Sequence, residues 1–301
     1  MKLIVQPGAS VAPIVTAIKQ ARKSVDILIF RMDRQDVIRA LEAAVGRGVA
    51  VRALIAHTNK GGEKTLRKLE LRLLEAGVTV SRTSDDLVRY HGKMLIIDAK
   101  WLHVYGFNFT ALDIEKSRSF GIMTRNPKLV QEAARLYEAD TNRVPYTTSS
   151  DRFIVSPVNA RERLAAFLKG ARKQLLIYDP HVCDDGMLKV IVERIKAGVE
   201  VRIIGKIEPK WNVRGEKFPG KRLHVRAIMR DGRDAFVGSQ SLRRLELQNR
   251  REVGIILRNE RAVRQMVTVF EQDWALTESG KKDAKKKSDK KSEKAEMAAA
   301  S

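Results

Sequence analysis

The chain contains an internal repeat, and this repeat constrains its fold more than any other feature of the sequence. Three segments recur later in the chain at one shared offset of 150 residues. They are 3–10 with 153–160, 19–29 with 169–179, and 46–52 with 196–202. Because this period is far longer than that of a solenoid repeat, we expect a duplicated domain rather than an array of short repeats.

Each copy alternates strand-like and helix-like segments. A short strand at 3–6 or 153–156 precedes a helix, a buried strand, a second helix and another strand. The buried strands "VDILIF" and "QLLIYD" are largely apolar on both faces, which is typical of a sheet covered by helices on both sides. We therefore predict an α/β fold of two duplicated α-β-α sandwich units with mixed sheets. We expect a pseudo-twofold axis between the units and an active site at their interface.

The repeat and the composition divide the chain into three parts. We assign residues 1–148 to unit 1, residues 149–279 to unit 2 and residues 280–301 to a lysine-rich tail. From residue 281 onward the tail has eight lysines, four acidic residues and no aromatic or β-branched residue. Such a segment cannot bury enough apolar surface to fold, so we expect disorder there.

The charge of the chain indicates its class of partner. The 301 residues carry a formal net charge of +22, which favours polyanions: a phospholipid or anionic membrane surface, or nucleic acid. No apolar run reaches the roughly 20 residues of a membrane-spanning helix. The apolar run at the start of the chain is too short for a signal peptide. We expect a cytoplasmic protein, with peripheral attachment to membranes as an option. The single cysteine, Cys183, excludes an internal disulfide and argues against a cysteine-rich zinc site.

A short polar motif stands out against this background. In "YHGKMLIID", at residues 90–98, His91 and Lys93 are two positions apart, so they share one face of a strand. The motif has a counterpart in unit 2, "LHVRAIMRD" at 223–231. The offset here is 133 residues, because unit 1 holds 17 extra residues between about 60 and 90. Each unit therefore supplies one such motif.

The two motifs match residue by residue. His224 corresponds to His91, Arg226 to Lys93, and Asp231 to Asp98. If the units pair about a twofold axis, the two histidines face each other and provide a nucleophile and a general acid for splitting a phosphodiester. The two cations would stabilise the charge that gathers on the phosphate oxygens, without any need for a metal.

These residues resemble the mark of the phospholipase D superfamily, H-x-K-x4-D followed by G-[GS]-x-[NS]. The copies here are "HGKMLIID" with "YGFN" at 105–108, and "HVRAIMRD" with "GSQS" at 238–241. The resemblance covers roughly residues 3–276. It implies a metal-independent reaction through a phosphohistidine, with no cofactor, in which His91 is the nucleophile and His224 protonates the leaving oxygen.

The resemblance also implies roles for further residues. Asn108 and Ser239 or Ser241 would bind the phosphate by hydrogen bonds. Asp98 and Asp231 would be structural or orienting. Glu252 stands where members of the family often place a carboxylate that orients a catalytic histidine.

The sequence departs from the family pattern at three positions. Arg226 replaces the second lysine, and its planar guanidinium is bulkier than an ammonium group. Ser119 stands in unit 1 where unit 2 has Glu252, so one histidine is expected to lack its carboxylate. Tyr105 occupies the position of the first glycine in "YGFN". The site is therefore expected to be asymmetric.

Two segments are candidates for substrate selection. The loop 206–222 leads into His224 and combines basic residues with Trp211 and Phe218, which we place at the mouth of the site. Such aromatic residues could insert among lipid headgroups or stack on the bases of single-stranded nucleic acid. The alternative is an ordinary surface loop with one anchoring tryptophan. The extra helix of unit 1, near 63–76, could pack on its own sheet or form a lid.

The leading functional hypothesis is a phospholipase D-type phosphodiesterase or phosphatidyltransferase that acts on phospholipid. A nuclease with the same two-histidine chemistry is the first alternative, since a basic surface suits it equally well. The second alternative is a degenerate protein that binds polyanions without catalysis, which Arg226 and the missing carboxylate would favour.

Overall fold

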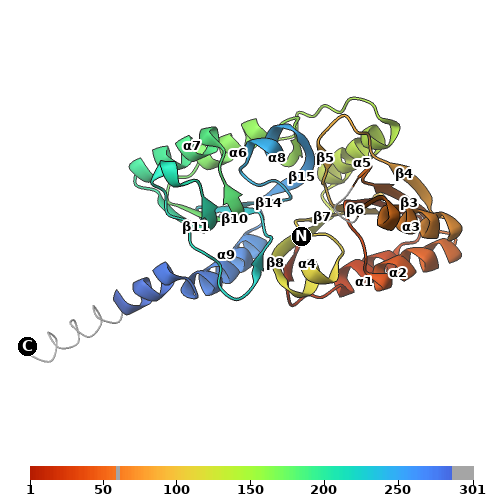
Figure 1. Ribbon diagram of the computed structural model, residues 1–301, viewed down its shortest axis with the longest axis horizontal. Helices are drawn as coiled ribbons and strands as arrows, with labels where there is room; N and C mark the ends of the chain where they lie inside the picture. The colour runs from red at the N-terminus through yellow and green to blue at the C-terminus, as the bar shows by residue number, and fades with distance from the viewer. Residues whose placement is uncertain (59–61, 287–301) are drawn as a thin grey trace, which may run out of the picture.

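The computed structural model describes residues 1–58 and 62–286 of the chain. They form two α/β units that lie side by side, unit 1 in red to yellow and unit 2 in green to blue (Figure 1). Each unit contains a mixed β-sheet with helices packed against it. The predicted α/β class and the two mixed sheets are confirmed.

The strands of unit 1 lie in the spatial order β1-β8-β7-β6-β2-β3-β4. Their bounds are β1 (Lys2–Gln6), β8 (Ser117–Thr124), β7 (Trp101–Tyr105), β6 (Met94–Ile97), β2 (Ser24–Ile29), β3 (Ala50–Ile55) and β4 (Thr79–Arg82). Strands β2, β3 and β4 run parallel, and the remaining pairs along this order are antiparallel.

The sheet of unit 2 repeats this order as β9-β15-β14-β13-β10-β11. Its strands are β9 (Phe153–Ser156), β15 (Arg250–Leu257), β14 (Asp234–Gly238), β13 (Ala227–Arg230), β10 (Gln174–Val182) and β11 (Glu200–Ile207). The register repeats too: His103 pairs with Met123 in unit 1, as the equivalent Phe236 pairs with Ile256 in unit 2. The duplication seen in the sequence is therefore a duplication of topology.

Helices cover both faces of each sheet. In unit 1 they are α1 (Ala12–Gln20), α2 (Gln35–Gly46), α3 (Gly62–Glu75), α4 (Ala111–Glu115) and α5 (Pro127–Asn142). In unit 2 they are α6 (Ala160–Lys169), α7 (Asp185–Lys196), the 3₁₀ turn η1 (Pro209–Trp211), α8 (Arg244–Gln248) and α9 (Glu260–Ala275). Among the helices of the described residues, none has the length and apolar character needed to cross a bilayer.

Three apolar cores hold these layers together. One lies between the unit 1 sheet and helices α1, α2 and α3, where Leu66 and Leu73 are buried, so α3 packs on its own sheet. A second lies between the unit 2 sheet and helices α6 and α7. The third is shared: it contains residues of both sheets together with α5 and α9. The shared core fixes the two units against each other.

Helix ends repeat between the units. Gly48 and Gly198 follow α2 and α7 with φ of +82° and +81°, the left-handed conformation that favours glycine after a helix. Asn126 and Asn259 are the N-caps of α5 and α9, and each side chain accepts a hydrogen bond from a backbone N–H three residues on. Equivalent residues therefore set equivalent boundaries.

The units exchange two short strands. Strand β5 (Arg89–Tyr90) belongs to unit 1 by sequence but pairs with β15 of unit 2. Strand β12 (Arg222–Leu223) belongs to unit 2 but pairs with β8 of unit 1. The paired residues are equivalent in the two units, so the exchange is reciprocal, as a pseudo-twofold relation requires. Each short strand leads directly into a motif histidine.

The end of the described chain differs from expectation. Residues 278–286 are helical, so the predicted disorder from residue 280 is wrong as far as residue 286. Specific contacts stabilise this turn, because the Ser279 hydroxyl donates to Glu216 at 2.6 Å and the Trp274 indole donates to Asp283 at 3.1 Å. The remainder of the predicted tail, 287–301, lies outside the described residues. The proposed boundary between the units, 148/149, falls between α5 and β9.

Candidate active site

Each motif histidine is held through its main chain by the other unit. The backbone N–H of His91 donates to the carbonyl of Arg251 at 2.7 Å, and that of His224 donates to the carbonyl of Arg118 at 3.1 Å. Arg251 and Arg118 are themselves equivalent, on β15 and β8. Both histidines are buried, with 7% and 6% of their surface exposed. Symmetric exchange of strands therefore places the two imidazoles at equivalent positions beside the unit interface.

The arginines that hold the histidines also bind the opposite unit through their side chains. Arg118 donates from Nε to Asp273 of α9 at 2.7 Å, and Arg251 donates from Nε to Asp140 of α5 at 3.1 Å. Asp140 and Asp273 are equivalent residues. Burial raises the pKa of Asp140 to about 6, although Arg251 opposes that shift. Each arginine thus connects the histidine of the opposite unit to the last helix of that unit.

A cation lies behind each histidine. Lys93 Nζ donates to the carbonyl oxygen of His91 at 2.6 Å, and Arg226 Nη1 donates to that of His224 at 2.9 Å. Lys93 is fully buried, and burial lowers its pKa to about 7. Arg226 therefore makes the same kind of backbone contact in motif 2 as Lys93 makes in motif 1.

The electrostatic field of the site keeps both imidazoles neutral. Burial, together with Lys93 and Arg226, holds the pKa of His91 well below its usual value. Burial and then Arg226 do the same for His224, and Lys93 also contributes. Because each cation acts on the histidines of both motifs, the four side chains share one electrostatic site. A neutral imidazole has the lone pair that a nucleophile needs.

Glu252 fixes the orientation of His91 across the unit boundary. Its carboxylate oxygens lie 2.9 and 3.1 Å from Nδ1 of His91, and the Phe30 ring packs edge-on against the imidazole with centroids 4.7 Å apart. Burial raises the pKa of Glu252, and Lys93 opposes that shift. An Nδ1–H that donates to Glu252 leaves Nε2 free to react.

His224 has a different arrangement. Ser119 occupies the position equivalent to Glu252, and among the described residues neither the Ser119 hydroxyl nor His224 Nδ1 has a hydrogen-bond partner. The nearest carboxylate is that of Asp113, 3.6 Å from Nδ1. Burial would raise the pKa of Asp113, but His224 and hydrogen bonds from Asn108 outweigh it and bring the pKa to about 2. Asp113 is thus an ionised partner for this imidazole.

The three predicted phosphate ligands, Asn108, Ser239 and Ser241, form different hydrogen bonds. Ser239 exchanges hydrogen bonds with Val253, donating to its carbonyl at 3.3 Å and accepting from its N–H at 3.1 Å, so it is engaged in the sheet. Ser241 accepts from Arg226 Nε at 3.2 Å. Asn108 donates to Asp113 at 2.8 Å, and its buried Oδ1 has no partner within the described residues. Asn108 and Ser241, which are equivalent residues, therefore lie beside the histidine and arginine of motif 2.

The motif aspartates lie at the other end of the strands from the imidazoles. Asp98 accepts hydrogen bonds from the backbone N–H groups of residues 22–24, at the start of β2. Asp231 accepts from residues 172–174 at the start of β10 in the same way. Both contacts hold a strand end, as expected of a structural residue.

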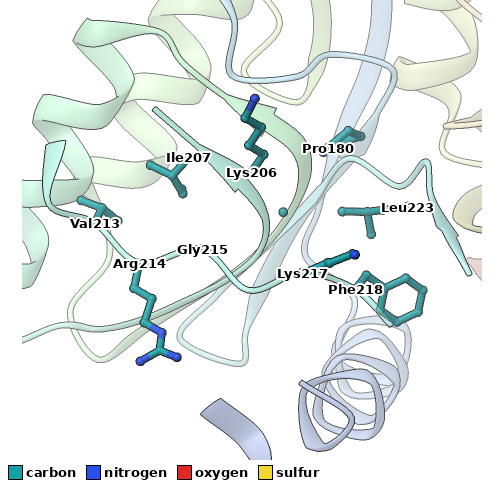
Figure 2. A pocket seen from close by; sticks show the side chains of 10 residues that line it. Pro180, Lys206, Ile207, Val213, Arg214, Gly215, Lys217, Phe218 and Leu223 are labelled. Atoms are coloured by element: carbon teal, nitrogen blue, oxygen red, sulfur yellow. The ribbon is translucent and has the colours of Figure 1, made fainter. Parts of the chain in front are cut away.

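The loop 206–222 forms part of a cavity of about 670 Å³ next to motif 2. Figure 2 shows Phe218 and Leu223 on one side of this cavity and Ile207 and Val213 on the other. Leu223 immediately precedes His224 in the chain, although neither motif histidine is among the lining residues. The lining also includes Lys206, Arg214 and Lys217.

The two aromatic residues predicted at the mouth differ in position. Phe218 is buried and lines the cavity. Trp211 is not among the lining residues; its indole donates to Asp185 at the start of α7 at 3.1 Å, and it packs against the unit 2 core. The alternative of an anchoring tryptophan therefore fits Trp211, and we do not retain it as a substrate contact.

Sequence reasoning missed two kinds of residue. The first is Asp113, which approaches His224 from a position unlike that of Glu252. The second is the pair of arginine–aspartate contacts between the units. The 133-residue offset could have revealed the second kind. Arg118 and Arg251 are separated by this offset, and so are Asp140 and Asp273.

Comparison with known proteins agrees with this geometry. The family model described as the phospholipase D-like domain of cardiolipin synthase matches residues 14–141, which include motif 1. Residues 14–141 are therefore similar to a phospholipase D-like domain. The match ends before motif 2, so the second half of the site rests on the duplication described above.

Individual proteins resemble this chain in sequence or in fold. The mitochondrial cardiolipin hydrolase of Danio rerio is 28% identical over 123 residues, which are 40% of this chain and 53% of that protein. The polyphosphate kinase of Porphyromonas gingivalis shares the fold with a TM-score of 0.73 at 19% identity, over 90% of this chain and 49% of that one. The phosphatidylserine synthase of Haemophilus influenzae has a TM-score of 0.68 at 8% identity, over 91% and 86%. The chain thus matches about half the length of the first two relatives.

Proposed function

We propose that the chain is a phospholipase D-type phosphodiesterase or phosphatidyltransferase that cleaves a phospholipid through a covalent phosphohistidine. One observation carries the proposal: two buried, neutral histidines stand at equivalent positions, each followed by a cation that acts on both. The partner is a phospholipid at an anionic membrane surface, to which a chain of net charge +22 is attracted. Residues 1–148 and 149–279 each supply one half of the site.

His91 is the nucleophile in this scheme. Glu252 accepts a hydrogen bond from Nδ1–H, so Nε2 attacks phosphorus and forms a P–N bond while the bond from phosphorus to the leaving oxygen breaks. Lys93 and Arg226 stabilise the negative charge on the phosphoryl oxygens. The asymmetry of the two carboxylates supports this assignment, because the hydrogen-bonded histidine is the one with a fixed orientation.

His224 is the general acid. The bound phosphodiester anion and the nearby Asp113 both raise the pKa of His224, so the imidazolium forms in the complex and protonates the leaving oxygen. The neutral His224 then takes a proton from water or from an acceptor alcohol, which attacks phosphorus and breaks the P–N bond. The acceptor decides between hydrolysis and transfer.

The experiment is to incubate the full chain with vesicles of phosphatidylcholine, phosphatidylglycerol and cardiolipin in the presence of chelator, and to measure headgroup release and phosphatidyl transfer. We expect turnover by the wild type, no turnover by His91→Ala, and a phosphorylated His91 after acid quench. Equal traces of product from wild type and variant would contradict the proposal.

A nuclease is the second candidate, and the basic lining of the cavity beside motif 2 favours it. Lys206, Arg214 and Lys217 could contact a nucleic acid backbone on either side of the scissile phosphate. Incubation with single- and double-stranded DNA in chelator separates the candidates, since cleavage that His91→Ala abolishes would support the nuclease. Binding to either polyanion without any trapped phosphohistidine would instead support a non-catalytic binding protein.

A further inference from the structure

A larger cavity lies in unit 1, and neither His91 nor His224 lines it. Its volume is about 1170 Å³, and it extends from helix α1 to the ends of β6, β7 and β8. Asp98, which lines it, is at the end of β6 remote from His91. A cavity of this size lies slightly above the usual range of small-molecule binding sites. The mechanism proposed above uses no residue of this cavity.

Unit 2 serves as an internal control for this cavity. At the position of Ala17 on α1, unit 2 has Phe167 on α6, and at the position of His103 on β7 it has Phe236 on β14. Both phenylalanines are buried, at 3% and 0% exposure, and belong to the same apolar core. Unit 1 thus has a methyl group and an imidazole at these two positions, although it also carries Trp101 and Tyr105 where unit 2 has Asp234 and Gly238.

In unit 2 a charged side chain also covers the Phe167 ring. Arg230 lies over the Phe167 ring, with its guanidinium 4.4 Å from the ring centroid. The equivalent of Arg230 in unit 1 is Ile97, which lines the cavity. An aliphatic side chain cannot form a cation–π contact, so both the ring and its charged cover are absent from unit 1. Ala17, Ile97 and His103, which all line the cavity, therefore differ from their equivalents in unit 2.

The rim of the cavity is positively charged. Lys2, Lys19, Arg22 and Arg47 all line it, and within the described residues none of them forms an ion pair. The acidic residue in the lining is Asp98, whose carboxylate already accepts three backbone N–H groups. Since no carboxylate is available to neutralise these side chains, an anion is the complementary ligand.

The interior of the cavity is apolar apart from one imidazole. Ile4, Ala17, Trp101 and Met123 contribute apolar surface. His103 is 1% exposed and makes a hydrogen bond of 2.8 Å between Nδ1 and the Tyr105 hydroxyl, which leaves Nε2 without a protein partner in the described parts of the chain. The lining thus combines a long apolar surface with a cationic rim.

We propose that this cavity in unit 1 binds a long-chain anion, with its chain against Trp101 and Met123 and its charged head at Lys19 and Arg22. A fatty acid and an alkyl phosphate share this chemistry. The proposal concerns a site separate from the two histidines, and it does not depend on the catalytic function proposed above.

The test measures binding of fluorescent cis-parinarate to the full chain, with dodecyl phosphate and dodecyltrimethylammonium as competitors below their micellar concentrations. We expect saturable binding of one parinarate per chain, displaced by dodecyl phosphate and not by the cationic amphiphile. The double variant Ala17→Phe/His103→Phe copies the unit 2 residues into unit 1 and should weaken binding at least tenfold.

A charge-matched pair of variants completes the test. Lys19→Glu/Arg22→Glu changes the rim of this cavity and should weaken binding about tenfold. Lys206→Glu/Lys217→Glu makes the same charge change beside motif 2 and should weaken it less than twofold. Equal affinity in all variants, equal loss in both charge variants, or displacement by the cationic amphiphile would each overturn the proposal. Because the rim variants alter exposed side chains only, they test it even if the core variant fails to fold.

Discussion

The Glu252 carboxylate lies 2.9 Å from Nδ1 of His91, although the two residues are 161 positions apart and belong to different units. The orienting carboxylate of one motif is therefore supplied by the opposite half of the duplication. Ser119, the equivalent of Glu252, makes no such contact with His224. The two histidines consequently occupy unequal environments within a symmetric framework.

Replacing Glu252 with glutamine should lower kcat/KM by about 10- to 100-fold, because the amide cannot hold the Nδ1–H as the carboxylate does. Initial rates with a chromogenic phosphodiester in chelator measure the effect. Ser119→Ala is the matched control on the other unit and should change kcat/KM less than threefold. A Glu252→Gln rate equal to that of the control would show that this contact does not orient the nucleophile.

Anion binding should be coupled to protonation of Lys93. With a pKa of about 7, this side chain is mostly neutral at pH 8, and a bound anion raises the pKa. Titration calorimetry with sulfate in buffers of different ionisation enthalpy should detect uptake of up to about one proton per sulfate at pH 8. Lys93→Met should abolish that uptake, and its persistence would assign the proton to another group.

The same lysine gives a prediction for stability. Its pKa is about 7 in the folded chain and about 10.5 when exposed, so the cost of burying its charge is fully present below pH 7. That cost declines as the pH rises toward 10. Compared with Lys93→Met, the wild type should therefore gain free energy of unfolding between pH 7 and pH 10 in urea titrations. A parallel pH dependence in the two proteins would refute the shift.

The arginine contacts should act across the unit boundary. Arg251→Met removes the partner of buried Asp140 and should lower the free energy of unfolding by about 3 kcal/mol. Histidine side-chain NMR should show the larger shift at His91, whose N–H donates to residue 251, and not at His224. Arg118→Met is the mirror-image control and should shift His224 instead. Perturbation of the histidine within the mutated unit would contradict this crossed arrangement.

The motif aspartates should affect folding more than chemistry. Asp98→Ala removes the acceptor of three backbone N–H groups at the start of β2 and should cost about 2 kcal/mol of stability. Because Asp98 is remote from the imidazoles, kcat/KM below the unfolding temperature should stay within threefold of the wild type. Thermal unfolding and initial rates of the same preparation check both parts. A large loss of activity in a fully folded variant would give Asp98 a direct role.

Much of this architecture can be predicted from the sequence because it follows from local patterns. The offset of 150 residues reveals the duplication, and the matching motifs identify His91 and His224. The carboxylate at Glu252 is predictable as an orienting residue, but the histidine that it serves is not. That pairing depends on the exchange of β5 and β12, which no local pattern encodes.

Other features depend on tertiary packing in ways that the sequence pattern does not reveal. Trp211 stands among cations in a loop next to the site, yet its indole binds Asp185 on the neighbouring helix α7. Asp113 approaches His224 because α4 starts shortly after the segment 105–108, where Asn108 donates a hydrogen bond to the carboxylate. In both cases contacts at the start of a helix determine the position of the side chain.

The segment between α5 and β9 joins two halves that complete each other's histidine environment. Two separate copies of one half could in principle form the same contacts by rotation, but their encounter would depend on protein concentration. A covalent connection makes that encounter intramolecular. It also allows one half to change without the same change in the other, as at Glu252 and Ser119, so that the surroundings of the two histidines can differ.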